Sequence, residues 1–116
     1  MSDVIIYHNP RCSKSRQTLA LLEERGINAD IRKYLETAPG ADELKAVLDK
    51  LGLSARDLLR TKEAEYKENH LDDASLTEEQ VIQLMTEFPR LIERPIVIKG
   101  NKARIGRPPE SVLEIL

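Results

Sequence analysis

The only cysteine of this 116-residue chain lies in the stretch YHNPRCSKSR, residues 7–16. Cys12 follows an apolar run and has Arg11, Lys14 and Arg16 around it, with no acidic residue in the stretch. The thiolate is the nucleophilic form of cysteine and nearby cations stabilise it, so this setting favours a reactive thiol. The alternative is a small buried apolar residue, because free cysteine is among the most buried residue types.

Two further side chains of this stretch could assist the thiol. His8 precedes Cys12 by four residues, close enough to support a thiolate or to contact a substrate. A histidine at a strand end is equally often a half-exposed, hydrogen-bonded residue. Ser15 could present its hydroxyl to the sulfur, or could simply occupy the first turn of a helix. Both alternatives stay open for each residue.

Three arginines elsewhere in the chain could bind an anion. Arg60, Arg94 and Arg107 lie at the ends of expected elements, where their planar guanidinium groups could converge on an oxyanion. Two of them belong to residues 89–109, which hold six cations against Glu93 alone. This stretch predicts an anion-facing surface. A single arginine is more often plain surface charge, however, and spacing does not show that the three meet.

The residue types exclude several familiar kinds of site. A Cys-x-x-Cys redox pair would need a cysteine at Ser15, so any second thiol must come from another molecule. A phosphatase-type Cys-x5-Arg loop would need an arginine at Thr18. One cysteine with the distant His8 and His70 does not make a zinc site, and no glycine-rich nucleotide loop is present. We therefore expect no metal and no tightly bound cofactor.

Composition and charge place the chain among the soluble globular proteins. Hydrophobic residues make up 41% and charged residues 33%, and no apolar run approaches the roughly 18 residues of a membrane span. The start of the chain has no pattern of a secretory signal, and one cysteine fits a reducing compartment, so we expect a cytoplasmic location and no membrane contact. An isoelectric point near 5.7 and an aromatic content of only 3% disfavour nucleic-acid binding.

The elements expected to position these residues alternate between strands and helices. Val4–Tyr7 is a β-branched run followed by a turn, and residues 13–25 are helix formers that end at Gly26. Cys12 would therefore lie at a helix start, where the dipole and unpaired N–H groups favour anions. The other expected elements are a strand over 27–35, helices over 39–51, 55–60 and 77–88, strands over 96–98 and 102–105, and a last helix from 108.

This order of elements is that of a thioredoxin-like domain. We predict one α/β domain over residues 1–116, with a mixed four-stranded sheet, flanking helices and a helical insertion at about 53–88. Capping boxes are expected where Ser54 precedes Asp57 and where Thr77 precedes Gln80. The acidic stretch between the two helices, residues 61–76, is interpreted as a solvated connection.

Five stretches of the chain together resemble a known family. They are YHNPRCSKSR, YLET at 34–37, LLR at 58–60, ERPIV at 93–97 and RIGRPPESVLEIL at 104–116. With these, the chain resembles the glutaredoxin-dependent arsenate reductases of the thioredoxin-like superfamily over essentially its whole length. The resemblance implies that Cys12 is the nucleophile, with His8 and Ser15 near its sulfur. It also implies that Arg60, Arg94 and Arg107 bind the oxyanion, and that Pro95 is a cis-proline facing the loop.

The implied activity is the reduction of arsenate to arsenite through a Cys12 thiol–arsenate adduct. Glutathione would be the co-substrate and glutaredoxin the protein reductant, because the chain has no second cysteine. Ser13-Lys14 replaces the Gly-Thr pair of better-known members, which could change anion affinity or the thiol pKa. Two other functions stay open: a glutathione-dependent thiol oxidoreductase with a different substrate, and a non-enzymatic redox-regulatory binding module.

Overall fold

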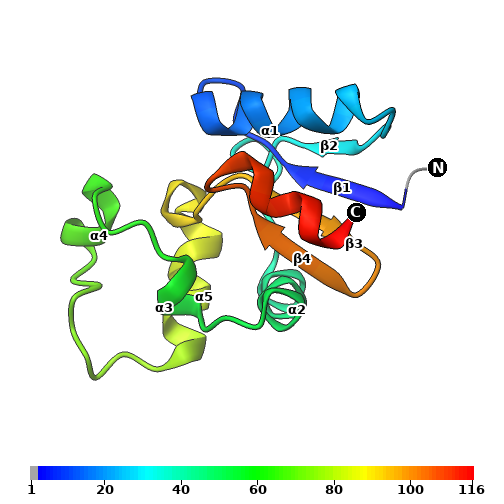
Figure 1. Cartoon of the computed structure of the whole chain (residues 1–116). Coiled ribbons are helices and arrows are strands. Elements are labelled where there is room, and N and C mark those ends of the chain that lie inside the picture. The colour runs from blue at the N-terminus through cyan, green and yellow to red at the C-terminus, as the bar shows by residue number, and fades with distance from the viewer. Residues whose placement is uncertain (1–2) are drawn as a thin grey trace. The chain divides into compact units, whose positions relative to one another are not determined.

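Four strands form a mixed sheet in the order β2-β1-β3-β4 (Figure 1). The strands are β1 (Val4–Tyr7), β2 (Asp30–Arg32), β3 (Ile96–Lys99) and β4 (Lys102–Ile105). β1 is parallel to β2 and antiparallel to β3, and β3 and β4 make an antiparallel hairpin. The predicted thioredoxin-like α/β class, with its mixed four-stranded sheet, is confirmed.

The sheet belongs to the first of two compact units into which the chain divides. The structure, a computed structural model, describes residues 3–116. The first unit holds residues 3–37 and 94–116, with helix α1 (Ser13–Glu24) and the 3₁₀ helix η2 (Pro109–Ile115). The second unit, residues 38–93, holds α2 (Ala41–Leu51), α3 (Ala55–Leu58), α4 (Ala64–Glu68), α5 (Glu78–Glu87) and the 3₁₀ helix η1 (Pro89–Leu91). Within the described residues, no helix is long and apolar enough to cross a membrane.

Helix α1 and helix η2 pack on one face of the sheet and close the core of the first unit. The alternation of a strand turns Val4 and Ile6 toward this face, and Ile6 pairs with the buried Val97 of β3. Leu22 is the fully buried apolar residue that α1 contributes to this core. The buried cluster consists of Val4, Ile6, Leu22, Val97, Val112 and Ile115. This packing holds the second half of α1 against the sheet.

The second strand is shorter than the predicted range of 27–35. Its beginning is displaced because the N–H of Ile27 donates to the carbonyl of Leu22 at 3.0 Å, which makes this residue part of the end of α1. Beyond Arg32, the Lys33 carbonyl accepts hydrogen bonds from the N–H groups of Glu36 and Thr37, and the chain turns. Local hydrogen bonds at both ends therefore reduce the strand to three residues.

Residues 61–76 are the largely exposed connection that the sequence predicts, and they also contain the short helix α4, which buries no side chain. The acids next to this helix bind cations: Glu63 forms ion pairs with Arg60 at 3.3 Å and with Arg90 at 3.2 Å. These ion pairs join the segment to other residues of the second unit.

Both predicted capping boxes are present in the second unit. The Thr77 hydroxyl accepts from the Gln80 N–H at 3.1 Å, and the Gln80 side chain accepts from the Thr77 N–H at 2.8 Å. Ser54 and Asp57 make the same reciprocal pair at the start of α3. The Glu78 carboxylate also accepts from the Ala55 N–H at 3.0 Å, which joins the starts of α3 and α5.

Candidate active site around Cys12

A tight loop leads from β1 into α1 and places Cys12 directly before the helix. Asn9 organises this loop with three hydrogen bonds, each of 3.0 Å. Its side-chain oxygen accepts from the Arg11 N–H, its carbonyl accepts from the Cys12 N–H, and its own N–H donates to the Ser15 hydroxyl. Sequence reasoning used Asn9 only as a turn former. The signal for its larger role was an asparagine two residues before a backbone donor, as in an Asx turn.

His8 is buried and lies against Ser15. The His8 Nδ1 and the Ser15 hydroxyl share a hydrogen bond of 2.8 Å, and Ser15 is completely buried. Burial lowers the pKa of His8, and the neighbouring charges of Lys33 and Arg16 lower it further, so the imidazole is neutral at pH 7. The Ser15 hydroxyl is thus engaged by His8 and by the Asn9 N–H. His8 connects to the cysteine loop through Ser15.

The Cys12 thiol is half-buried and has a shifted pKa. Burial alone would raise this pKa, but the Ser15 N–H, the Arg94 guanidinium and the Lys14 N–H together lower it below its ordinary value. The two N–H groups belong to the first turn of α1, where backbone donors lack helical partners and the dipole is positive. These contributions favour the thiolate, which supports the interpretation of Cys12 as a nucleophile.

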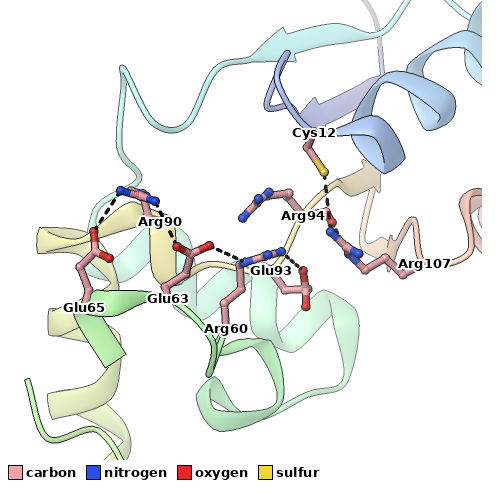
Figure 2. Close-up of polar contacts among 8 residues, drawn as sticks. All are labelled: Cys12, Arg60, Glu63, Glu65, Arg90, Glu93, Arg94 and Arg107. Atoms are coloured by element: carbon pink, nitrogen blue, oxygen red, sulfur yellow. Dashed lines mark hydrogen bonds and ion pairs between the residues drawn. The ribbon is translucent and has the colours of Figure 1, made fainter. Parts of the chain in front are cut away.

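Two of the three predicted arginines act on the cysteine sulfur. Figure 2 shows the contact made by one of them, Arg107. Nη2 of Arg107 lies 3.6 Å from Sγ of Cys12, and its Nε donates to the Arg94 carbonyl at 2.8 Å. Arg94 acts on the same sulfur through a side-chain hydrogen bond and its charge. The Arg94–Pro95 peptide bond is cis, as the resemblance implies, and the Arg107–Pro108 bond, for which no cis bond was predicted, is also cis.

Close packing at Gly106 positions the segment that carries Arg107. A Cβ atom at Gly106 would lie 2.5 Å from Thr18 Oγ1 and 2.8 Å from Pro95 Cγ, distances that side-chain atoms do not reach without displacement. The Gly106 N–H donates to the Pro95 carbonyl at 2.9 Å. Thr18 is itself buried and donates to the Lys14 carbonyl at 2.8 Å. Sequence reasoning did not identify Gly106 or Thr18, because their importance depends on a long-range contact.

Arg60 lies in the second unit, where two carboxylates hold its guanidinium (Figure 2). Its Nη1 is 2.7 Å from Glu93 Oε1, and its Nε is 3.3 Å from Glu63 Oε1. The Arg60 N–H donates to the Leu91 carbonyl at 2.7 Å, so the backbone is also fixed. Arg60 is therefore a partly buried member of an ion-pair network. Its role as an oxyanion ligand stays a prediction.

The cationic stretch 89–109 divides into residues with different partners. Arg90 pairs with carboxylates of the second unit, and Arg104 pairs with Glu114 at 2.9 Å. Arg94 and Arg107 act on Cys12 instead. Among residues 3–116, no cluster of three His, Cys, Asp or Glu side chains is placed to hold a metal ion.

Known proteins are similar to this chain over nearly its whole length. The model of the ArsC family matches residues 7–115. An Escherichia coli K12 protein named uncharacterized protein YfgD is 58% identical, over 97% of this chain and 96% of its own. The arsenate reductase of Haemophilus influenzae is 53% identical, over 97% of this chain and 98% of its own. The solved structure of the arsenate reductase from Vibrio cholerae is 55% identical, with a TM-score of 0.96 and 97% of each chain covered.

Proposed function

Because the chain belongs to the ArsC family, we propose that it reduces arsenate to arsenite, with Cys12 as nucleophile and with glutathione and glutaredoxin as reductants. The observation that carries this proposal is the Cys12 thiol at the start of α1. Its pKa is lowered, and the guanidinium groups of Arg94 and Arg107 act on its sulfur. A nucleophile and two cations at one helix start suit attack on the centre of an oxyanion.

In the first step, the Cys12 thiolate attacks the arsenic atom of arsenate. The Sγ–As bond forms, and one As–O bond breaks as its oxygen takes up protons and leaves as water. Arg94 and Arg107 favour this step because they bring positive charge to the place where the anion reacts. Backbone N–H groups of the first turn of α1 add donors for its oxygens.

In the second step, the thiolate of glutathione attacks Sγ of the Cys12 adduct. A sulfur–sulfur bond forms and the Sγ–As bond breaks, so that its electron pair passes to arsenic and reduces As(V) to As(III). Arsenite leaves, and Cys12 remains as a mixed disulfide with glutathione. A glutaredoxin thiolate then attacks the glutathione sulfur, and the Cys12 thiolate returns.

The external reductants follow from the cysteine count. The chain has one cysteine, so the oxidising equivalent cannot be resolved as an internal disulfide. Thioredoxin, which reduces disulfides within or between proteins by a dithiol, would find no internal disulfide here. Glutathione supplies the missing thiol and creates the mixed disulfide that glutaredoxin removes.

The decisive measurement is NADPH consumption coupled through glutathione reductase, with arsenate, glutathione and glutaredoxin present. We expect turnover by the wild type and a background rate for Cys12→Ser, because a serine hydroxyl is not ionised at neutral pH. Replacement of glutaredoxin by thioredoxin should also give the background rate. Equal rates for the wild type and Cys12→Ser would contradict the proposal.

The predicted anion ligands are tested in the same assay with Arg107→Ala, Arg94→Ala and Arg60→Ala. A charge-assisted contact is worth about 1.5–3 kcal/mol, so each loss should lower kcat/KM for arsenate about ten- to hundredfold. Arg104→Ala is the control, because the Arg104 side chain is 41% exposed and is paired with Glu114. An unchanged kcat/KM for Arg60→Ala would show that this arginine serves the ion-pair network alone.

Two outcomes would favour the other functions. Negligible arsenate turnover, with Cys12 still rapidly modified by oxidised glutathione, would indicate a thiol oxidoreductase with another substrate. A Cys12 thiol with the reactivity of an ordinary cysteine would indicate a binding module, which has no need of a thiolate.

A further inference from the structure

A pocket of about 310 Å³ lies beside the loop that precedes Cys12. It is at the carboxyl ends of the parallel strands β1 and β2, which is where α/β sheets bind ligands. Its volume is at the lower end of the range for small-molecule sites. The residues that line it are His8, Asn9, Pro10, Arg11, Lys33, Leu35 and Glu36.

One side of this pocket is formed by the turn that follows β2, residues 33–37, and several contacts hold this turn in place. The Lys33 carbonyl accepts from the N–H groups of Glu36 and Thr37, both at 3.0 Å. Arg32 Nε donates to the Thr37 carbonyl at 2.9 Å, and its guanidinium carbon lies 5.7 Å from the centre of the Tyr7 ring. The other side of the pocket, residues 8–11, is joined to this turn, because the His8 N–H donates to the Arg32 carbonyl at 2.8 Å. The pocket is therefore a built feature of the first unit.

The side chains of the pocket have a distinctive set of charges. Arg11 and Lys33 supply two cations, Glu36 supplies one anion, and His8 is neutral. Pro10 and Leu35 add apolar surface, and Leu35 is 39% exposed although it is a large apolar residue. A complementary ligand carries two carboxylates, one ammonium group and a short apolar middle.

We propose that this pocket binds the external thiol, a peptide-sized zwitterion whose two carboxylates lie near Arg11 and Lys33 and whose ammonium group lies near Glu36. Arg11 is the neighbour of Cys12, so the pocket and the thiol belong to the same loop. The catalytic meaning of this site rests on the proposed function, which requires an outside thiol. Glutathione has the required groups and is the probe for the test.

The test uses a reaction that needs no arsenate. The Cys12 thiolate attacks one sulfur of oxidised glutathione, a new disulfide forms, the original disulfide breaks, and one glutathione thiolate leaves. The rate is followed by the mass gain of the intact protein. A neutral disulfide, bis(2-hydroxyethyl) disulfide, undergoes the same exchange and reports the intrinsic reactivity of the thiolate.

Lys33→Glu should slow the reaction with oxidised glutathione about fivefold or more and leave the rate with the neutral disulfide unchanged. Lys33→Gln should give a smaller, selective slowing. Lys102→Glu is the matched control: Lys102 is exposed in β4 of the same unit, and the same change of charge there should alter neither rate. An equal effect of Lys33→Glu on both disulfides, or an effect on neither, would overturn the proposal.

These outcomes are separable from those of the proposed function. Selective slowing by Lys33→Glu in a protein that fails to turn over arsenate would retain the pocket and reject arsenate reduction. Arsenate turnover that depends on Cys12, with no selective effect of Lys33→Glu, would retain the reductase and reject the pocket.

Discussion

The reactivity of Cys12 depends more on backbone groups than on the cations beside it in the sequence. The N–H groups of Ser15 and Lys14 and the guanidinium of Arg94 lower the thiol pKa against the opposing effect of burial. His8 acts on the cysteine loop only indirectly, because its ring shares a hydrogen bond with the Ser15 hydroxyl. Lys14 of the Ser13-Lys14 pair thus acts on the sulfur through its backbone N–H.

This balance predicts the pH dependence of thiol alkylation. The thiolate is the reactive form, and the folded-state pKa of the thiol is lowered. As the pH is lowered, the rate of reaction with iodoacetamide should therefore fall at a lower pH than it does for an ordinary cysteine. Arg94→Ala should move the inflection to higher pH, whereas Arg104→Ala should not. By the same linkage, the thiol stabilises the fold at pH values above its unfolded pKa, and this stability is lost as the pH falls through the folded pKa. An inflection that stays in place in Arg94→Ala would contradict the assignment.

The start of helix α5 combines a capping box with a hydrogen bond to a second helix, α3. Its capping box pairs Thr77 with Gln80, and the next residue, Glu78, accepts from the Ala55 N–H of α3. The two helix starts are therefore coupled within the second unit. Arg60 follows α3 in the chain, and the Leu91 carbonyl holds its backbone N–H.

Removal of this cap should destabilise the protein by a moderate amount. Thr77→Ala deletes the acceptor of the Gln80 N–H, which costs about 1 kcal/mol at a helix N-cap. Thr77→Ser keeps a hydroxyl at the same position and should stay close to the wild type. The measurement is urea unfolding followed by circular dichroism. A loss of equal size in both variants would mean that the Thr77 methyl group, and not the cap, stabilises α5.

For the whole molecule, the decisive contact brings three distant segments of the first unit together at Gly106. Thr18 of α1, Pro95 before β3 and Gly106 after β4 meet with no room for a side chain. Arg107 comes next in the chain and lies at the Cys12 sulfur. The position of this guanidinium thus depends on packing around a glycine.

Gly106→Ala should disturb both stability and the site. An added methyl group against Thr18 and Pro95 overpacks this contact and should cost about 1–3 kcal/mol of unfolding free energy. The control is Gly40→Ala, where a Cβ meets nothing within 4 Å and the loss at the start of α2 should stay below about 1 kcal/mol. Urea unfolding measures both, and equal stability losses would show that the close approach at Gly106 is tolerated.

The sequence by itself determined the features that depend on neighbouring residues. The turn at Asn9-Pro10, the helix start at Cys12 and the two capping boxes arise from hydrogen bonds over a few residues, so residue types at short spacing predict them. That the chain cannot form an internal disulfide follows from the cysteine count alone. The order of the elements was enough to predict the fold class.

Only the tertiary structure decided which side chains meet. Arg107 is separated from Cys12 by 95 positions, and no local pattern distinguishes it from Arg104, which pairs with Glu114. Packing of α1 against the sheet, with Gly106 at the contact, brings Arg107 to the sulfur. The pocket at Lys33 likewise depends on two parallel strands that end side by side, a consequence of pairing across the sheet rather than of spacing along the chain.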